Sequence, residues 1–164
     1  MADMLAKLYQ LPELEPYLQT MKTKSISIRP ALAPELHFVS QWVAEHFSLY
    51  WQSEVIKAFS NTPITCYLAI EDGEIIGFAC IETTMRGFFG PTGVSESARG
   101  KQVGKTLLIY ALHQLKNLGY AYGVIGGVGP KEFYQQAVGA TEIPDSTPGI
   151  YQGLLRVKEK INVS

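Results

Sequence analysis

The sequence has little of what several classes of protein need. It contains two cysteines and three histidines, and these lie far apart, without the close spacing of a zinc site. No apolar run approaches the roughly 20 residues of a membrane-spanning helix. The formal net charge is −1, so no overall field draws the chain to nucleic acid or to an anionic membrane. The sequence therefore predicts no metal, no nucleic-acid partner and no membrane partner.

What is present is typical of one folded domain. Hydrophobic residues make up 46% and charged residues 18% of the chain, which argues against disorder. A chain of 164 residues can bury a substantial core. The first residues, Met1–Leu5, lack the basic leader and sustained apolar stretch of a secretion signal. We therefore expect a cytoplasmic protein.

The two cysteines lie on strands that the sequence predicts to pair. Asp72–Gly73 is typical of a two-residue hairpin turn. In the register that this turn sets, Cys66 and Cys80 project to opposite faces of the sheet. The sequence therefore predicts two reduced thiols rather than a disulfide, unless a bulge near the turn shifts the register.

Hydrophobic periodicity predicts a mixed α/β domain over residues 25–164, in which strands precede and follow two central helices. Strands are predicted at 25–29, 64–70, 75–84, 88–94, 120–128, 140–143 and 150–156. Helices are predicted at 34–47, 51–59, from the 99–106 loop to Gly119, and at 131–138. Residues 1–24 repeat leucine at helical steps but are interrupted by Pro12 and Pro16. They are predicted to form an N-terminal helical extension, packed on the domain surface or serving as a dimer arm.

The most informative segment is the loop at residues 99–106, RGKQVGKT. It follows the strand at 88–94 and opens the helix that contains Leu107. Such a loop presents unpaired backbone N–H groups at the positive end of a helix dipole, which suits phosphate oxygens. Arg99, Lys101 and Lys105 add positive charge.

One interpretation of this loop is a nucleoside-triphosphate P-loop, which requires glycine, four residues, then Gly-Lys-Ser/Thr. Gly104–Lys105–Thr106 supplies the ending, but Arg99 stands where the first glycine belongs, and Gly100 comes one residue late. Several predicted strands also precede the loop, whereas a P-loop usually follows the first one. The spacing therefore disfavours a P-loop-like nucleotide binder.

The other interpretation is a family resemblance. Arg99-x-x-x-Val103-Gly104, placed after Gly93–Ser97, resembles motif A of the GNAT superfamily of N-acetyltransferases. Phe133–Tyr134 followed by Gly139–Ala140 resembles a later segment of that superfamily, and Ile26–Arg29 resembles its first strand. The resemblance covers about residues 25–157. It implies a mainly antiparallel central sheet with splayed middle strands, flanked by helices on both faces.

Within the strand at 88–94, Gly90, Pro91 and Gly93 favour a bulge. The resemblance implies that this bulged strand splays from its neighbour and opens a slot for acetyl-coenzyme A. Gln102 departs from the motif, because a glycine normally stands there. If that glycine serves close approach or positive φ, Gln102 should weaken cofactor binding.

The resemblance also implies the roles of individual residues. A backbone N–H near Val94 would polarise the thioester carbonyl, and Tyr134 would protonate the leaving thiolate. The alternative for Tyr134 is a core aromatic residue whose hydroxyl reaches a backbone partner. The implied cofactor-binding residues are Gly93, Val94, Arg99, Gly100, Lys101, Gln102, Val103, Gly104, Lys105 and Thr106.

Acceptor selection is expected on the first two helices of the domain, where Trp42, His46, Phe47, Tyr50, Trp51 and Glu54 gather in sequence. Aromatic rings with a carboxylate suit a cationic amine, so Trp51 and Glu54 are the candidate acceptor contacts. The alternative is that the aromatic residues are core and Glu54 is solvated. Glu82 or Glu96 could serve as a base, but the sequence assigns none.

The expected function is acetyl-CoA-dependent transfer of an acetyl group to a primary amine of a small molecule or peptide. Neither cysteine is predicted near the loop, so direct attack is expected rather than an acyl-cysteine intermediate. The alternative is a non-catalytic acyl-CoA-binding regulatory module, to which Gln102 points. A homodimer is compatible with the resemblance, although no residue pattern indicates one.

Overall fold

The computed structural model describes residues 1–156, so the last eight residues of the predicted domain, 157–164, lie outside it. Within this range, seven strands form one sheet in the order β2-β3-β4-β5-β6-β1-β7. The strands are β1 Met4–Lys7, β2 Ile26–Pro30, β3 Cys66–Glu71, β4 Glu74–Ile81, β5 Phe88–Val94, β6 Tyr122–Ile125 and β7 Thr141–Glu142. The helices are α1 Glu15–Thr23, α2 Leu36–His46, α3 Leu49–Ser60, α4 Val103–Asn117 and α5 Lys131–Val138. Short 3₁₀ turns lie at Leu8–Gln10, Ala33–Glu35, Glu96–Ala98 and Gly149–Tyr151.

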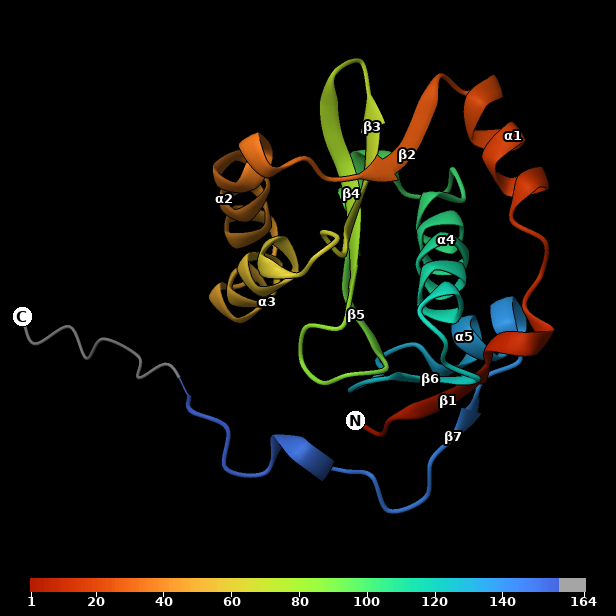
Figure 1. The fold of residues 1–164 in the computed structure, drawn as a ribbon, viewed down its shortest axis with the longest axis vertical. Coiled ribbons are helices and arrows are strands. Elements are labelled where there is room, and N and C mark those ends of the chain that lie inside the picture. Colours follow the sequence, from red (N-terminus) through yellow and green to blue (C-terminus); the bar gives the residue numbers. More distant parts are fainter. Residues whose placement is uncertain (157–164) are drawn as a thin grey trace, which may run out of the picture.

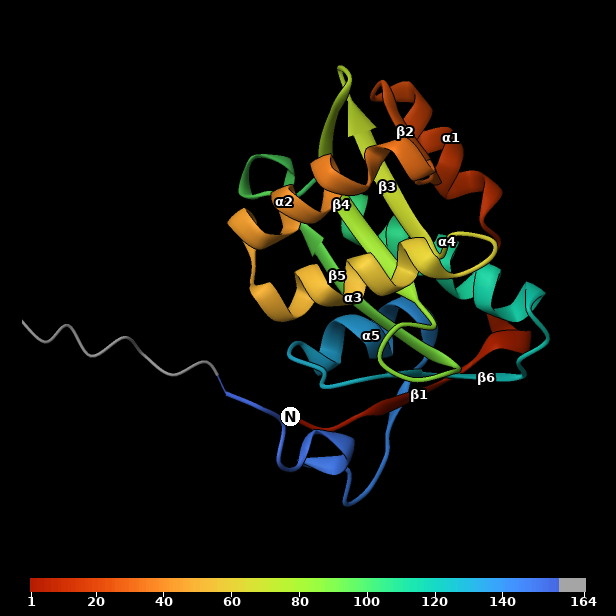
Figure 2. The same cartoon turned by 60° about the vertical axis from the view of Figure 1, so that its left-hand side comes forward.

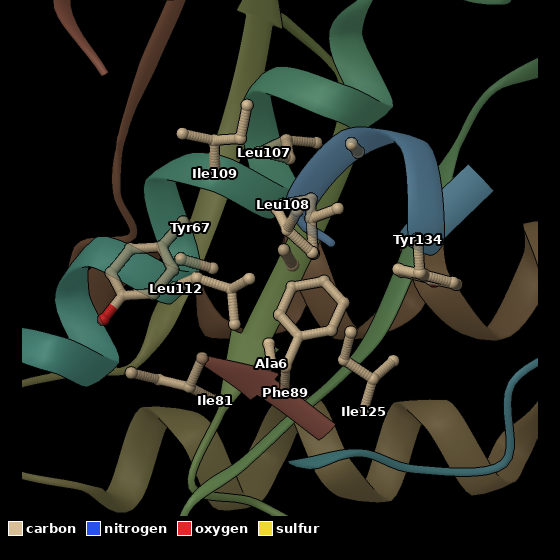
Figure 3. Close-up of a cluster of buried hydrophobic side chains, with 14 of the residues drawn as sticks. Ala6, Tyr67, Ile81, Phe89, Leu107, Leu108, Ile109, Leu112, Ile125 and Tyr134 are labelled. Atoms are coloured by element: carbon tan, nitrogen blue, oxygen red, sulfur yellow. The ribbon is translucent and has the colours of Figure 1, made fainter. Parts of the chain in front are cut away.

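Helices cover both faces of the sheet, with α2 and α3 on one side and α1, α4 and α5 on the other (Figure 1). Side chains alternate along β3 and β4 and so supply both layers. Leu68 and Phe78 pack with the α2–α3 residues, while Ala69 and Ala79 pack with α4. Figure 3 shows the second cluster, in which leucines of α4 meet Phe89 and neighbouring side chains from the sheet. The predicted mixed α/β fold with helices on both faces is confirmed.

The middle of the sheet is splayed, as predicted. Described strand pairs are antiparallel except β5 with β6, which is parallel and has only two paired positions, Phe88 with Val124 and Phe89 with Ile125. Residues 90–94 therefore continue without β6 beside them, and the two strands diverge (Figure 2). The ladder between β4 and β5 also shifts register between Ala79 and Ile81, which confirms the bulge that glycine and proline indicated.

The register predicted for the cysteines is wrong. Cys66 and Cys80 are direct cross-strand partners and so share one face, because the β3–β4 register shifts at Ala69/Ile70. One extra residue in a strand moves every later side chain to the other face. Both thiols are free and buried beneath α2 and α3, and burial raises the pKa of Cys80.

The N-terminal segment differs from the expected helical extension. Residues Glu15–Thr23 form α1, but Met4–Lys7 form a strand inside the sheet, between β6 and β7. Met4, Ala6 and Leu8 are fully buried. Their alternation with Leu5 and Lys7 is typical of a strand. The segment forms a strand because the edge of β6 supplies its backbone hydrogen-bond partner.

Two predicted strand segments near sheet ends are also wrong. Residues 150–156 form no strand, because β1 already occupies the place beside β6 and the chain leaves the sheet after β7. The strand predicted to reach residue 84 ends at Ile81, since Glu82 adopts a left-handed φ of 63°. The Glu82 carboxylate accepts the Gly87 N–H at 2.6 Å, so it braces the loop between β4 and β5.

Candidate functional site

The loop between β5 and α4 presents a row of backbone amides. Thr106 donates the first intrahelical N–H bond of α4, to Gln102 O at 3.1 Å. The amides of Val103, Gly104 and Lys105 therefore lack an intrahelical acceptor. They sit at the positive end of a 15-residue helix, an arrangement that suits phosphate oxygens.

Gln102 takes the backbone conformation that a motif glycine would supply. Its φ is 63° and ψ is 18°, which lies in the left-handed region. Its side chain forms no capping hydrogen bond to the helix. A residue with a Cβ is strained there, so the departure from the motif falls at a position where glycine has a conformational advantage.

A pocket of about 380 Å³ opens at this loop. It lies between the end of β5, the start of α4 and one aromatic residue of α5. Its lining residues are Val94, Ala98, Arg99, Gly100, Gln102, Val103, Gly104, Lys105 and Phe133. Seven of the ten predicted cofactor contacts thus line one cavity, and Gly93, Lys101 and Thr106 lie beside them in the chain without lining it.

The amide of Val94 points toward the splayed side of β5. Ser95 donates its N–H to Ile76 O at 2.8 Å, on the β4 side. Since N–H directions alternate along a strand, the Val94 N–H points the other way, where β6 has diverged. It is therefore a donor without a sheet partner, on a residue that lines the pocket.

Tyr134 lies in the core just behind the pocket. Its side chain is 7% exposed, and its ring packs edge-on against Phe89, with the ring centroids 6.4 Å apart (Figure 3). The Phe133 ring also packs edge-on against it, at 5.0 Å. The hydroxyl has no hydrogen-bond partner within residues 1–156. Burial raises the pKa of Tyr134, so the hydroxyl stays protonated at neutral pH and can donate a proton.

A second pocket, of about 510 Å³, lies on the α2 side of β5. It shares Val94 and Arg99 with the first pocket, so the two cavities meet at the end of β5. Its lining residues are Glu45, His46, Phe47, Val94, Ser95, Glu96, Ser97 and Arg99. Its charged lining residues thus include two carboxylates, Glu45 and Glu96, and the Arg99 guanidinium that the two pockets share.

Comparison with known proteins decides the family. The model of the Acetyltransferase (GNAT) family matches residues 27–139, which is more than half of the chain. The chain belongs to the GNAT acetyltransferase family. No curated protein matches it. Membership supports acetyl-CoA-dependent acetyl transfer as the general activity.

Solved GNAT structures share the fold. One is the GCN5-related glucosamine N-acetyltransferase region of a fungal multi-domain GH3 β-N-acetylglucosaminidase, with a TM-score of 0.71 and 14% identity over 87% of this chain and 19% of that one. Another is a GCN5-related N-acetyltransferase from Sphaerobacter thermophilus, with a TM-score of 0.66 and 20% identity over 87% and 48%. A GNAT acetyltransferase from Brucella melitensis in complex with acetyl-CoA has a TM-score of 0.50 and 21% identity over 68% and 80%. This chain thus spans under half the length of the first two, and at these identities the likeness shows the fold alone.

The aromatic residues expected at the acceptor end of this GNAT domain form a packed cluster. Phe47 lies over β5, and its ring atoms are 2.4–2.8 Å from where a Cβ on Gly93 would stand. Glycine is therefore required at position 93 for close approach. Trp51 packs against Phe47 and Phe78, with ring centroids 5.0 and 6.1 Å away. His46 contacts the Trp42 carbonyl through Nδ1 at 2.9 Å.

Glu54 is neither solvated nor in the second pocket. It lies on α3, and its carboxylate accepts a hydrogen bond from the Thr84 hydroxyl in the loop between β4 and β5. Burial raises the pKa of Glu54, while the hydrogen bond from Thr84 opposes the shift. The neighbouring Thr83 hydroxyl donates to Gly90 O at 3.0 Å, so the loop that contacts Glu54 is itself held to β5 near the point where the strands diverge.

Sequence reasoning missed several residues of the site. Glu45 belongs to the second pocket, but as one carboxylate on an exposed helix turn it carries no distinguishing signal. Phe133 lines the first pocket, and its place beside Tyr134 in the motif could have identified it. Lys24 reaches the phosphate loop from a distant turn. Within residues 1–156, no helix is long and apolar enough to cross a membrane, and no cluster of His, Cys, Asp or Glu is arranged to hold a metal.

Proposed function

We propose that this GNAT domain is an acetyl-CoA-dependent N-acetyltransferase that acetylates a primary amine of a small molecule or peptide by direct attack. The observation that carries the proposal is the cavity formed by the 99–106 loop and Phe133, which meets at Val94 a second cavity that contains the carboxylates of Glu45 and Glu96. One cavity suits an anionic acyl donor and the other a cationic acceptor. The two substrates would thus approach the end of β5 from opposite sides.

The chemistry uses groups already in place. The Val94 N–H would donate to the thioester oxygen as negative charge develops on it. The amine loses one proton to solvent and attacks the carbonyl carbon, a C–N bond forms and the C–S bond breaks. Tyr134 would give its proton to the departing sulfur and recover one from the acetylated nitrogen. The amine and the acetyl thioester are thus converted into an amide and a free thiol without a covalent enzyme intermediate.

The acceptor contacts are part of the same proposal. Of the two acceptor contacts expected from the sequence, Trp51 would act through Phe47, which it packs against and which lines the second pocket. Glu54 lies outside that pocket, so the carboxylates that would contact the amine directly are Glu45 and Glu96. Carboxylates on this side favour an acceptor that arrives as an ammonium ion. A cytoplasmic location, suggested by two buried free thiols, and a homodimer are further predictions.

The experiment that tests this function is acetyl transfer by Tyr134→Phe. Release of free thiol from acetyl-CoA is followed with a panel of primary amines, and coenzyme A affinity is measured by calorimetry. We expect an unchanged Kd and a kcat reduced by about 10²-fold or more, the usual contribution of a proton donor. The matched control is Tyr110→Phe, since Tyr110 packs against Tyr67 instead of the pocket. Equal kcat in both variants would exclude the role given to Tyr134.

The second candidate is a non-catalytic acyl-CoA-binding module, which the strained Gln102 favours. Melting curves with acetyl-CoA, coenzyme A and Mg-ATP in parallel separate the candidates, because a ligand at 100 times its Kd adds about 2.7 kcal/mol of stability. Stabilisation by the coenzyme A species without thiol release for any amine supports the module. Stabilisation by Mg-ATP alone contradicts both candidates and supports the P-loop interpretation instead.

A further inference from the structure

Helix α1 precedes the residues that the GNAT family model matches, yet it lies beside the phosphate loop (Figure 1). The core holds it there. Met21 is 1% exposed, and Leu14 and Tyr17 pack against the same cluster as the α4 leucines. A hydrogen bond of 2.7 Å between His113 of α4 and the Pro12 carbonyl fixes the segment that leads into it. Side chains at the end of α1 therefore have a defined place relative to the loop.

Lys24, the C-cap residue of α1, reaches into the phosphate loop. Its Nζ donates to the backbone carbonyl of Lys101 at 2.9 Å. An ammonium group has three N–H donors, so this contact leaves two of them for another acceptor. Within residues 1–156, Lys24 forms no ion pair with a carboxylate. Its charge is placed at the loop, and no described carboxylate pairs with it.

Other cations surround the same place. Lys105, in the first turn of α4, lies over the Tyr17 ring of α1 at 5.4 Å and also forms no ion pair among the described residues. Lys101 pairs with Glu71 at 3.5 Å. The side of the loop that faces α1 thus carries two cations, Lys24 and Lys105, that no described carboxylate pairs with. They are available for a second phosphate group on the same ligand.

We propose that Lys24 and Lys105, held by α1, form a subsite for the phosphate on the ribose of coenzyme A, separate from the loop amides that would bind its pyrophosphate. The inference rests on the proposed function, since it deepens the recognition of the same acyl donor. Lysine binds phosphate as a compact point charge with several donors. The subsite makes the protein select coenzyme A over the same molecule without its ribose phosphate, dephospho-coenzyme A.

Calorimetric titration with coenzyme A and with dephospho-coenzyme A tests the subsite. We expect the unaltered protein to bind coenzyme A more tightly. Lys24→Ala should weaken coenzyme A binding about fivefold to tenfold, the range for one charge-assisted hydrogen bond at an exposed site, and leave dephospho-coenzyme A binding unchanged. Lys24→Arg should retain most of the preference. Added salt should reduce the preference, because exposed charges are screened.

The matched control is Lys22→Ala, a basic residue in the last turn of the same helix with no described contact to the loop. It should leave both affinities unchanged. If Lys24→Ala weakens the binding of both ligands equally, Lys24 only positions the loop through the Lys101 carbonyl, and the inference is overturned. Equal affinity of the unaltered protein for both ligands would overturn it as well. Absence of binding by either ligand would refute the proposed function itself, which is a distinct outcome.

Discussion

Replacing Gln102 with glycine tests how the phosphate loop is built. Gln102 holds a φ of 63°, and a left-handed conformation costs a residue with a Cβ roughly 1–2 kcal/mol. Glycine avoids that cost but loses roughly 0.5–1 kcal/mol more backbone entropy on folding. The difference predicts that Gln102→Gly stabilises the free protein by about 0.5–1 kcal/mol. For a chain of this size the melting temperature should rise by about 1–4 °C.

Binding should respond for a different reason. The strain at residue 102 is present with and without ligand, so its relief does not change affinity. The Gln102 side chain, however, lines the 380 Å³ pocket, and its removal lets a phosphate approach the Val103 amide more closely. We therefore expect coenzyme A to bind Gln102→Gly more tightly, measured by calorimetry.

Gln102→Ala separates the two effects, because it keeps the Cβ and the strain but removes the rest of the side chain. It should bind coenzyme A more tightly than the unaltered protein without a rise in melting temperature. A melting temperature for Gln102→Ala equal to that of Gln102→Gly would refute the conformational reasoning. Weaker coenzyme A binding by both variants would show instead that the glutamine amide itself donates to the ligand.

Two further predictions concern the acceptor side. Gly93→Ala places a Cβ about 2.4 Å from the Phe47 ring and should destabilise the protein by roughly 1–3 kcal/mol, measured by urea denaturation, because the site is overpacked. Adding Phe47→Leu to this variant should recover part of the lost stability. Strictly additive losses of stability for the two substitutions would contradict the contact. Burial raises the pKa of Glu54, so the folded state holds the carboxyl proton more tightly than the unfolded state does. The ionised carboxylate therefore lowers the stability of the folded state once the pH rises above the ordinary pKa of a glutamate. Glu54→Gln should therefore raise the melting temperature more at pH 8 than at pH 4 relative to the unaltered protein, and a difference independent of pH would argue against burial as the cause.

Local signals in the sequence determined much of the framework. Strand β5 and helix α5 have the predicted bounds, Phe88–Val94 and Lys131–Val138, because turn residues and proline mark their ends. Helix α4 follows its loop and ends before Gly119, whose φ is 106°. The loop residues and the family follow from the same short stretch. Such features depend on neighbours along the chain, which a sequence displays directly.

Contacts between distant segments decided the rest. Met4–Lys7 became a strand because β6 offers an unpaired edge, and that pairing left residues 150–156 without a place in the sheet. One register shift at Ala69/Ile70 brought the cysteines to the same face. The approach of Phe47 to Gly93 and of Lys24 to the phosphate loop likewise joins remote parts of the chain. The sequence alone determined most of the central elements and the loop motif that indicates the family. Only the tertiary structure decided which edges pair, in which register, and which side chains meet at the site. Those choices depend on backbone partners and packing surfaces that exist only once the chain has folded.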